Sequence, residues 1–212
     1  MEAIQRFTSR CVPLLRDHVD TDQIFPGRYL TTVDKAGAGD RLFANWRYDP
    51  DGRSQANFIL NRPEMRDRRI LVSGENFGAG SSREHAVWAL LDFGFRAIAA
   101  RSFADIFCSN AMKNGLLPIK LSSDAHSELV AALRIDQDAE VTVDLLTTTL
   151  TLPGGRLVTF PIEPFTKSLL LEGTDELGYL LGHRQAIEAF EDRHPADVDT
   201  RVIPNPTTGA GR

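Results

Sequence analysis

Several features that mark other protein classes are missing from this sequence. Its 212 residues contain no apolar run close to the roughly 20 residues that cross a bilayer, and no apolar signal-peptide core follows the first residues. The 24 basic and 29 acidic residues give a net charge of −5, and the basic residues do not cluster. These absences argue against a membrane protein and against a nucleic-acid-binding protein, and they predict a cytoplasmic location.

Metal-ligating residues are also scarce. The two cysteines, Cys11 and Cys108, are far apart, and the five histidines are dispersed without an HExxH or HxH pattern. Zinc and iron–sulfur sites usually need three or four protein ligands. We therefore expect no metal site in this chain, and a cluster, if the chemistry uses one, would be held by another chain.

The remaining composition, 42% hydrophobic and 25% charged, is that of a globular domain, and the patterns along it alternate between strand and helix. A polar turn is expected at 17–22 and a long loop at 26–57. Strands are expected at 4–15, 69–73, 97–100, 116–121, 140–145, 148–152 and 158–161, and helices at 82–93, 104–113, 124–134, 165–171 and 185–192. This order predicts an α/β fold with one domain over residues 1–193 and a disordered tail over 194–212.

The segment richest in chemistry is residues 74–85, GENFGAGSSREH. Its glycines allow a tight turn, and Ser81 followed by Glu84 has the capping-box spacing that starts a helix. Free N–H groups at a helix start, together with the guanidinium of Arg83, would bind a carboxylate or a phosphate. The spacing alone fits equally well an ordinary capped helix with a surface arginine.

Three familiar loops do not match this segment. A P-loop needs Gly-Lys-Ser/Thr, and no lysine occurs between Lys35 and Lys113. A dinucleotide-binding GxGxxG would need glycine where Arg83 stands, and the nucleophile elbow GxSxG lacks its closing glycine at Glu84. None of these three loop classes therefore accounts for the segment, and an ordinary capped helix with a surface arginine remains an alternative.

The sequence of residues 76–86, NFGAGSSREHA, resembles the motif of the swivelling domain of the aconitase superfamily. Further segments are similar to that family in the same order: VDTDQI at 19–24, LFANWR at 42–47, SFADIF at 102–107 and NGLLP at 114–118. The resemblance covers roughly residues 4–190. It implies a swivelling β/β/α domain of the aconitase C-terminal type, with a mixed sheet and flanking helices.

The resemblance also implies a reaction and a partner. It points to the small subunit of an isopropylmalate-type hydro-lyase of leucine biosynthesis, which removes and re-adds water on a hydroxy-dicarboxylate. The expected partner is a large subunit that carries a 4Fe-4S cluster, in a heterodimer or a heterotetramer. A labile iron of that cluster would act as Lewis acid on the substrate.

By match to the family motif, Ser81 would be the base that removes a proton from carbon. Ser82 and Arg83 would bind a substrate carboxylate, Arg83 through its planar fork. Asp22 matches a family acid that approaches the serine, although a turn carboxylate that caps its own loop fits the local sequence almost as well. Glu84 and His85 are interpreted as structural, Glu84 as a cap and His85 as a packed hydrogen-bond donor.

Substrate choice is expected in a mobile loop at about 27–40. Relatives that take tricarboxylates carry arginine after the tyrosine-leucine pair, whereas this chain has Thr31 after Leu30. An uncharged loop suits an isopropyl group, because a carboxylate there would be desolvated without a partner. Arg28 could fold inward and bind a carboxylate, but exposure to solvent is the simpler interpretation.

Two alternatives remain at this level. A related small subunit could act on citraconate, a methylated malate or a homocitrate-type acid. A protein of another class, a non-catalytic anion-binding module, could have kept the loop and lost its partner, although the intact Ser81, Ser82 and Arg83 argue against it.

Overall fold

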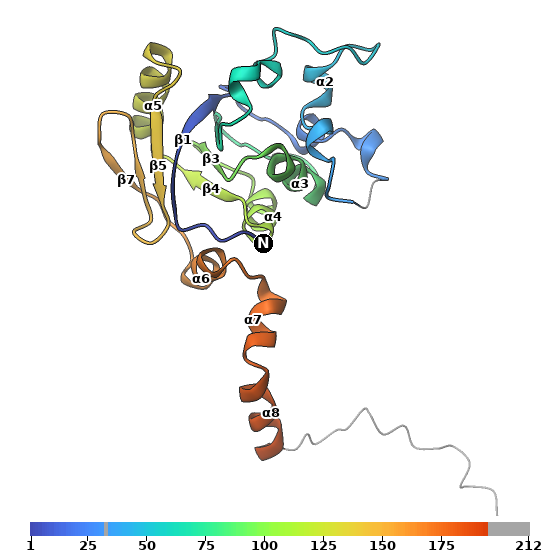
Figure 1. Ribbon diagram of the computed structural model, residues 1–212, viewed down its shortest axis with the longest axis vertical. Helices are drawn as coiled ribbons and strands as arrows, with labels where there is room; N and C mark the ends of the chain where they lie inside the picture. Colours follow the sequence, from blue (N-terminus) through green and yellow to red (C-terminus); the bar gives the residue numbers. More distant parts are fainter. Residues whose placement is uncertain (32–33, 195–212) are drawn as a thin grey trace, which may run out of the picture. The chain divides into compact units, whose positions relative to one another are not determined.

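The computed structural model describes residues 1–31 and 34–194. In this part of the chain, seven strands form one mixed sheet of order β4-β3-β2-β1-β5-β6-β7 (Figure 1). The strands are β1 (Arg6–Pro13), β2 (Ile70–Val72), β3 (Ala97–Ala100), β4 (Leu117–Lys120), β5 (Glu140–Asp144), β6 (Thr149–Thr151) and β7 (Leu157–Thr159). The predicted α/β class with a mixed sheet and flanking helices is therefore confirmed.

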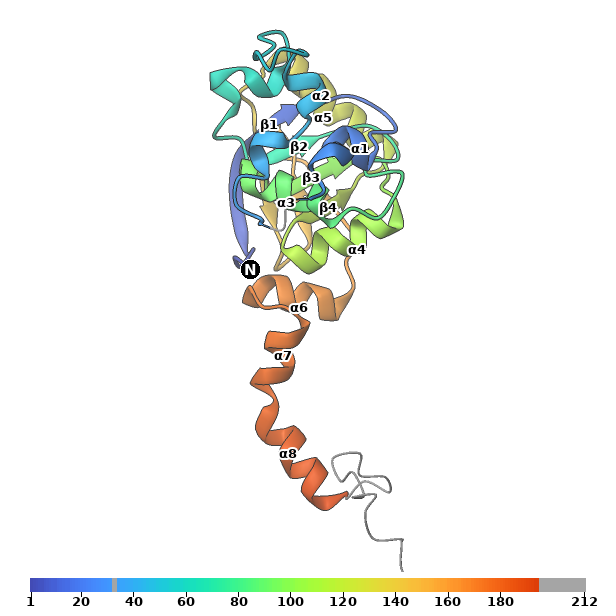
Figure 2. The same ribbon diagram turned by 90° about the vertical axis from the view of Figure 1, so that its right-hand side faces the viewer.

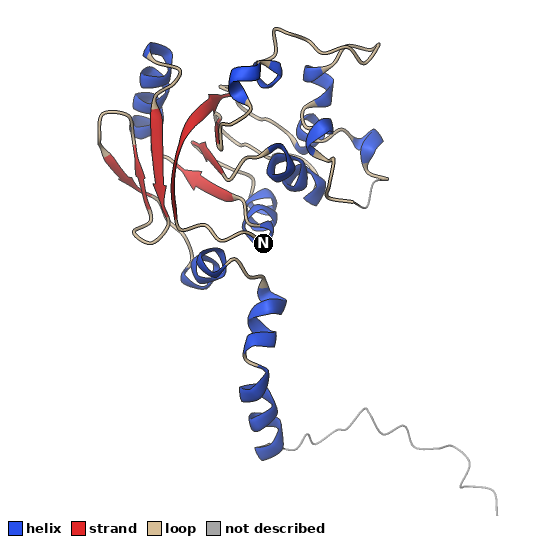
Figure 3. Ribbon diagram, viewed as in Figure 1, coloured by secondary structure: helices blue, strands red, loops and turns tan. Residues whose placement is uncertain are grey.

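The helices lie between and after these strands (Figure 3). They are α1 (Thr21–Ile24), α2 (Ala44–Arg47), α3 (Glu84–Phe93), α4 (Asp105–Asn114), α5 (Ser123–Ile135), α6 (Pro164–Glu172), α7 (Glu176–Gly182) and α8 (Arg184–Arg193). Short 3-10 turns are η1 (Gly27–Tyr29), η2 (Gly39–Arg41), η3 (Ile59–Asn61) and η4 (Pro63–Met65). Glycines end α3 and α4, because Gly94 and Gly115 adopt the left-handed conformation with φ of 115° and 89°.

Strand β1 lies between a parallel half and an antiparallel half of the sheet. It pairs in parallel with β2, with Cys11 opposite Ile70, and antiparallel with β5, with Thr8 opposite Thr142. Strands β2, β3 and β4 continue the parallel half, with α3 and α4 as the connections between them. Strands β5 to β7 form an antiparallel meander. The central strand β1 therefore links the two halves by its hydrogen bonds, whereas the chain passes from one half to the other through α5, between β4 and β5.

The two faces of the sheet bury two hydrophobic clusters. Successive strand residues point to opposite faces, so Leu71 and Ile98 enter one cluster while Ile70 and Ala97 enter the other. The first cluster also takes buried residues of α3 and α4, and the second takes residues of α5 and of the meander. Figures 1 and 2 show α3 and α4 on one side of the sheet and α5 on the other.

The expected polar turn at 17–22 and the expected loop at 26–57 contain short helices that were not predicted. Helix α1 begins inside the predicted turn, where Asp20 accepts a hydrogen bond from the Gln23 N–H (2.7 Å) and the Gln23 side chain accepts one from the Asp20 N–H (3.0 Å). This capping box stabilises a helix too short to show apolar periodicity. Helix α2 and the 3-10 turns lie in the predicted loop, and α7 was missed because its seven residues include two glycines.

The chain divides into two compact units, Met1–Asp175 and a second that begins at Glu176. The first unit contains the whole sheet and helices α1 to α6, and the second contains α7 and α8. The extent of a single domain over 1–193 and the mobility of the loop at 27–40 stay predictions. The predicted tail lies, from residue 195 on, outside the described residues. No helix of the described part is long and apolar enough to span a bilayer.

Candidate active site

The candidate site lies where the parallel strands β1, β2 and β3 end. The segments that follow these strands are tied together by backbone hydrogen bonds, from the His18 N–H to the Glu75 carbonyl (2.8 Å) and from the Arg101 N–H to the Gly74 carbonyl (3.1 Å). Ligand sites of α/β sheets commonly form at the carboxyl ends of parallel strands. The residues 74–85 singled out in the sequence therefore occupy the expected edge of the sheet.

Two motifs that are some sixty positions apart in the chain meet at this edge. The Thr21 N–H donates to the Ala79 carbonyl (2.8 Å), and the Thr21 hydroxyl donates to the Ser81 carbonyl (2.8 Å). The Gly78 N–H donates to the Val19 carbonyl (2.7 Å). Helix α1 and the glycine loop are therefore fixed relative to each other, and buried Thr21 is the residue that joins them.

Glycine is required in this loop at Gly78. Its φ is +79°, and a Cβ there would lie 2.2 Å from Cγ of Phe107 on α4. Phe107 is itself only 3% exposed and packs edge-on against Phe77, with ring centroids 5.3 Å apart. The loop can thus approach α4 only because position 78 has no side chain.

The start of α3 differs from the predicted capping box. The helix begins at Glu84 with Arg83 as N-cap residue, and no side chain caps it. Ser81 cannot take the cap position because Thr21 binds its carbonyl, and Glu84 does not reach back because its carboxylate accepts a hydrogen bond from Asn114 (2.8 Å). The capping-box prediction and the role of Glu84 as a cap were therefore wrong, and Ser81 lies before the helix.

The guanidinium of Arg83 forms hydrogen bonds with three groups of the site. Its Nε donates to Oγ of Ser81 (3.1 Å), and its Nη1 donates to the Phe25 carbonyl (3.2 Å) and to Oδ1 of Asp22. Within the described part of the chain, Nη2 of Arg83 donates to no other group, so it is available to a ligand oxygen. The structure thus brings together three of the predicted site residues, Ser81, Asp22 and Arg83.

Asp22 has two partners at one oxygen. Oδ1 accepts from Arg83 and from the backbone N–H of Gly27 (2.9 Å). These hydrogen bonds, that of Arg83 first, hold the pKa of Asp22 below its ordinary value. Asp22 therefore closes its own turn, as one interpretation predicted, and also pairs with Arg83; its role as a family acid stays a prediction.

Ser82 points to a different neighbour. Its Oγ accepts a long hydrogen bond (3.5 Å) from the amide of Asn110 on α4, and the side chains of Ser81 and Ser82 are both exposed. Exposed hydroxyl groups beside a half-buried guanidinium are arranged to meet a ligand that comes from solvent or from a partner protein.

The predicted substrate segment starts next to the site. Turn η1 follows Gly27, where a Cβ would lie 3.2 Å from Oδ1 of Asp22 and 3.7 Å from Nη2 of Arg83. Leu30 and Thr31 come directly after this turn and are exposed. Arg28 is exposed, as the simpler interpretation had it, and its guanidinium also contacts Asn45 and Tyr29.

Asn114, at the end of α4, forms hydrogen bonds with residues of α3 next to the site. The sequence did not identify it as a site residue. Its amide donates to Glu84 (2.8 Å), and its carbonyl accepts from Nε1 of Trp88 (3.0 Å) and from Nζ of Lys35 (3.2 Å). The Trp88 ring contacts the imidazole of His85 at a centroid distance of 4.6 Å, which agrees with the packed role predicted for His85. The signal in the sequence was only the Asn-Gly pair at 114–115.

Among the described residues, no group of three or more histidine, cysteine or acidic side chains could hold a metal ion. Burial raises the pKa of Cys11 to about 12 and that of Cys108 to about 11, so both thiols stay protonated. Iron–sulfur clusters usually need three or four cysteine thiolates, so these two residues, Cys11 on β1 and Cys108 on α4, do not fit such a cluster.

The mixed sheet and the anion-binding loop agree with a match to the model of the aconitase C-terminal domain, which covers residues 1–124. More than half of the chain thus matches, so the protein is a swivelling-type domain of the aconitase superfamily, as its motifs predicted. Comparison with individual relatives identifies the family within this superfamily more closely. The 3-isopropylmalate dehydratase small subunits of Roseiflexus castenholzii and Anaeromyxobacter dehalogenans (strain 2CP-C) are 50% and 51% identical.

These two matches span 94% and 90% of this chain and 98% of each relative. The crystal structure of 3-isopropylmalate dehydratase from Methanocaldococcus jannaschii matches 88% of this chain and 99% of its own chain, with a TM-score of 0.63 and 29% identity. The chain therefore belongs to the family of 3-isopropylmalate dehydratase small subunits.

Proposed function

We propose that this chain is the small subunit of an enzyme that interconverts 2-isopropylmalate and 3-isopropylmalate by dehydration and rehydration, as a step of leucine biosynthesis. The observation that carries the proposal is the contact of Arg83 with both Ser81 and Asp22 inside the family motif. The names of the relatives, which span nearly the whole chain at about half identity, support the same reaction.

Ser81 is proposed as the acid/base residue. A serine hydroxyl is a weak base in water, so it must lose its proton where a cation stabilises the oxygen. Nε of Arg83 already donates to Oγ of Ser81 at 3.1 Å, and this charge-assisted hydrogen bond would strengthen on the alkoxide. The alkoxide would take the proton from the substrate carbon during dehydration and return it during rehydration.

Arg83 and Ser82 are proposed to hold a substrate carboxylate. In the described part of the chain, Nη2 of Arg83 donates to no group, and the neighbouring residue Ser82 is exposed. Asp22 would keep the guanidinium in this orientation. Because the pKa of Asp22 is lowered, the acid stays ionised and holds Arg83 at any pH near neutrality.

Leu30 and Thr31 are proposed to contact the variable group of the substrate, and Arg28, on the same segment, is proposed to bind a carboxylate where a substrate carries one at that position. The first two side chains carry no charge and lie on the segment that begins beside Asp22, so they suit an isopropyl group. Relatives with arginine at the position of Thr31 would instead favour a carboxylate.

A large iron–sulfur subunit is proposed as partner, because the relatives are small subunits by name and because the thiols of this chain do not fit a cluster. The two free cysteines are in keeping with a cytoplasmic location, where disulfides are rare.

Co-purification with a large subunit, followed by an absorbance assay for the unsaturated intermediate, tests the proposed function. The assembled enzyme is expected to form that intermediate from 3-isopropylmalate faster than from citraconate-forming, methylated or homocitrate-type acids. A preference for one of those acids would assign the chain to a related hydro-lyase, and failure to recover any iron–sulfur subunit would favour a non-catalytic anion-binding module.

Replacing Arg83 by lysine is expected to raise KM and to lower kcat/KM by about 10- to 100-fold, because an ammonium cannot contact Ser81, Asp22 and a substrate carboxylate together. Steady-state kinetics of the assembled enzyme measure both constants. The exposed Arg66, changed to lysine, is the matched control and should leave them within about twofold. An unchanged KM in Arg83→Lys would remove Arg83 from substrate binding.

Replacing Thr31 by arginine is expected to shift specificity toward an additional carboxylate. The change would desolvate a guanidinium against isopropyl and give a carboxylate its missing partner, which corresponds to about 1 to 3 kcal/mol in the ratio of specificity constants. The measurement compares isopropylmalate with a tricarboxylate, for wild type and variant with the same large subunit. Thr147→Arg, in the exposed turn after β5, should leave the ratio unchanged. An unchanged ratio in Thr31→Arg would place the choice in Arg28 or in the large subunit.

A further inference from the structure

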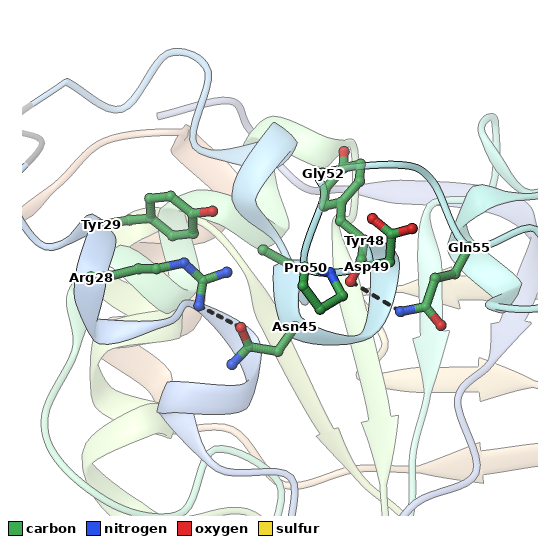
Figure 4. Close-up of a pocket in the computed structure, with 9 residues that line it drawn as sticks. Arg28, Tyr29, Asn45, Tyr48, Asp49, Pro50, Gly52 and Gln55 are labelled. Carbon is green, nitrogen blue, oxygen red and sulfur yellow. Dashed lines mark hydrogen bonds between the residues drawn. The ribbon is translucent and has the colours of Figure 1, made fainter.

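An open cavity of about 710 Å³ lies beside the substrate segment (Figure 4). It is lined on one side by Arg28 and Tyr29 of η1 and on the other by residues 44–55, among them Asn45, Tyr48 and Gln55. Neither Ser81 nor Arg83 lines it. A charged side chain of the substrate segment thus lies in a polar cavity that is separate from the proposed catalytic groups.

Arg28 is held in this cavity by neutral groups. Its Nη1 donates to Oδ1 of Asn45 (2.5 Å), and its guanidinium carbon lies 4.6 Å from the centre of the Tyr29 ring (Figure 4). In the described part of the chain, Arg28 forms no ion pair with a carboxylate. Since arginine binds carboxylates more strongly than amides, Arg28 keeps its capacity for a carboxylate ligand.

Asn45 is the fixed member of this pair. Helix α2 is anchored in the core through Phe43, whose side chain is fully buried and whose N–H donates to the Ile24 carbonyl (2.7 Å). The Phe43 ring also stacks on Trp46 at 5.3 Å. Arg28, by contrast, is exposed and has four rotatable side-chain bonds, so it is the side chain that can change direction.

The backbone next to Arg28 is linked to the proposed substrate site by hydrogen bonds. The N–H of Gly27 binds Asp22, which in turn binds Arg83. The charge of Arg28 also contributes to the low pKa of Asp22, after the hydrogen bonds from Arg83 and Gly27. The guanidinium of Arg28 is therefore close enough to Asp22 for the two charges to interact.

We propose that Asn45 is a specificity-determining positioning residue, which holds Arg28 in the cavity and thereby keeps a second guanidinium away from the variable group of the substrate. This inference rests on the proposed function. With Arg28 held on Asn45, the substituent meets the uncharged Leu30 and Thr31. When Asn45 is lost, Arg28 turns toward the substrate and favours a carboxylate in place of the isopropyl group.

The test uses the enzyme assembled with its large subunit and compares 3-isopropylmalate with isocitrate, which is malate carrying carboxymethyl in place of isopropyl. Isocitrate is measured as substrate and as competitive inhibitor, so a value is obtained even where its turnover is slow. Asn45→Ala is expected to strengthen isocitrate inhibition by about three- to tenfold relative to the KM for isopropylmalate. Asn45→Asp, which pairs with Arg28 by charge, is expected to weaken it.

Two further variants decide the interpretation. Arg28→Gln in the Asn45→Ala background should remove the gain, because the gain requires the guanidinium. Gln55→Ala alters the same cavity through an amide that donates to the Tyr48 carbonyl (3.0 Å), and it should leave the ratio unchanged. An unchanged ratio in Asn45→Ala, a gain that persists without Arg28, or an equal gain in Gln55→Ala would overturn the inference. Absent turnover of isopropylmalate by wild type would instead refute the proposed function.

Discussion

Changing Ser81 to alanine is expected to lower turnover of the assembled enzyme by about 100- to 10,000-fold, the usual loss when a general base is removed. The physical reason is local: Oγ of Ser81 is the oxygen that Arg83 contacts at 3.1 Å, and no other hydroxyl takes its place on Nε. KM should change little, because Nη2 of Arg83 and the hydroxyl of Ser82 remain. Stopped-flow or steady-state absorbance of the unsaturated intermediate measures the effect.

The matched control is Ser123→Ala. Ser123 is an exposed serine at the first position of α5, which packs on the opposite face of the sheet. It should retain wild-type turnover, and both variants should keep wild-type thermal stability and bind the large subunit. More than about a tenth of wild-type activity in Ser81→Ala would mean that another group is the base.

Changing Arg68 to methionine is expected to lower the free energy of unfolding by about 2 to 5 kcal/mol, because several part-buried acceptors lose their donor at once. Arg68 is 2% exposed and holds together segments that are far apart in the chain. Its guanidinium donates to the carbonyls of Cys11 (2.8 Å), Gln137 (2.5 Å) and Glu64 (3.1 Å) and to Oδ1 of Asp138 (2.7 Å). Methionine fills much of the volume but leaves these acceptors without a donor.

Urea unfolding of the chain measures this loss. Arg6→Met is the matched control, because Arg6 also lies on the sheet but its side chain is 70% exposed and its nearest contact with Asp144 is 3.9 Å. Such a surface pair contributes at most about 1 kcal/mol. Arg68→Lys should fall between wild type and Arg68→Met, since an ammonium reaches fewer of the four acceptors. Equal stability of Arg68→Met and Arg6→Met would contradict the role assigned to Arg68.

Arg68 also shows why part of the fold was not visible in the sequence. It stands in the run RDRR at 66–69, and nothing local distinguishes it from the exposed Arg66 of the same run. Its burial follows from carbonyl groups of residues 11 and 137, which only the pairing of β1 with β2 and with β5 brings near. Long-range pairings of this kind leave no periodicity in the sequence.

Elements with a strong local pattern were predicted within a few residues. Apolar runs predicted β2 and β3. Helices α3 and α4 end at Gly94 and Gly115, which adopt the left-handed conformation of a helix cap. Elements stabilised by a single side-chain contact were predicted wrongly or missed. The start of α3 moved to Glu84 because Thr21 holds the Ser81 carbonyl, and α1 depends on one capping box at Asp20.

The sequence by itself determined the α/β class, the family and the identity of the proposed catalytic groups, because these depend on apolar periodicity and on a contiguous motif at 76–86. Only the tertiary structure decided how the groups act together. It joined Asp22 to Arg83, left Nη2 of Arg83 open, and turned Arg28 onto Asn45. These outcomes depend on distances between segments that follow different strands, and such distances are set by the packing of the sheet and not by any local preference of the chain.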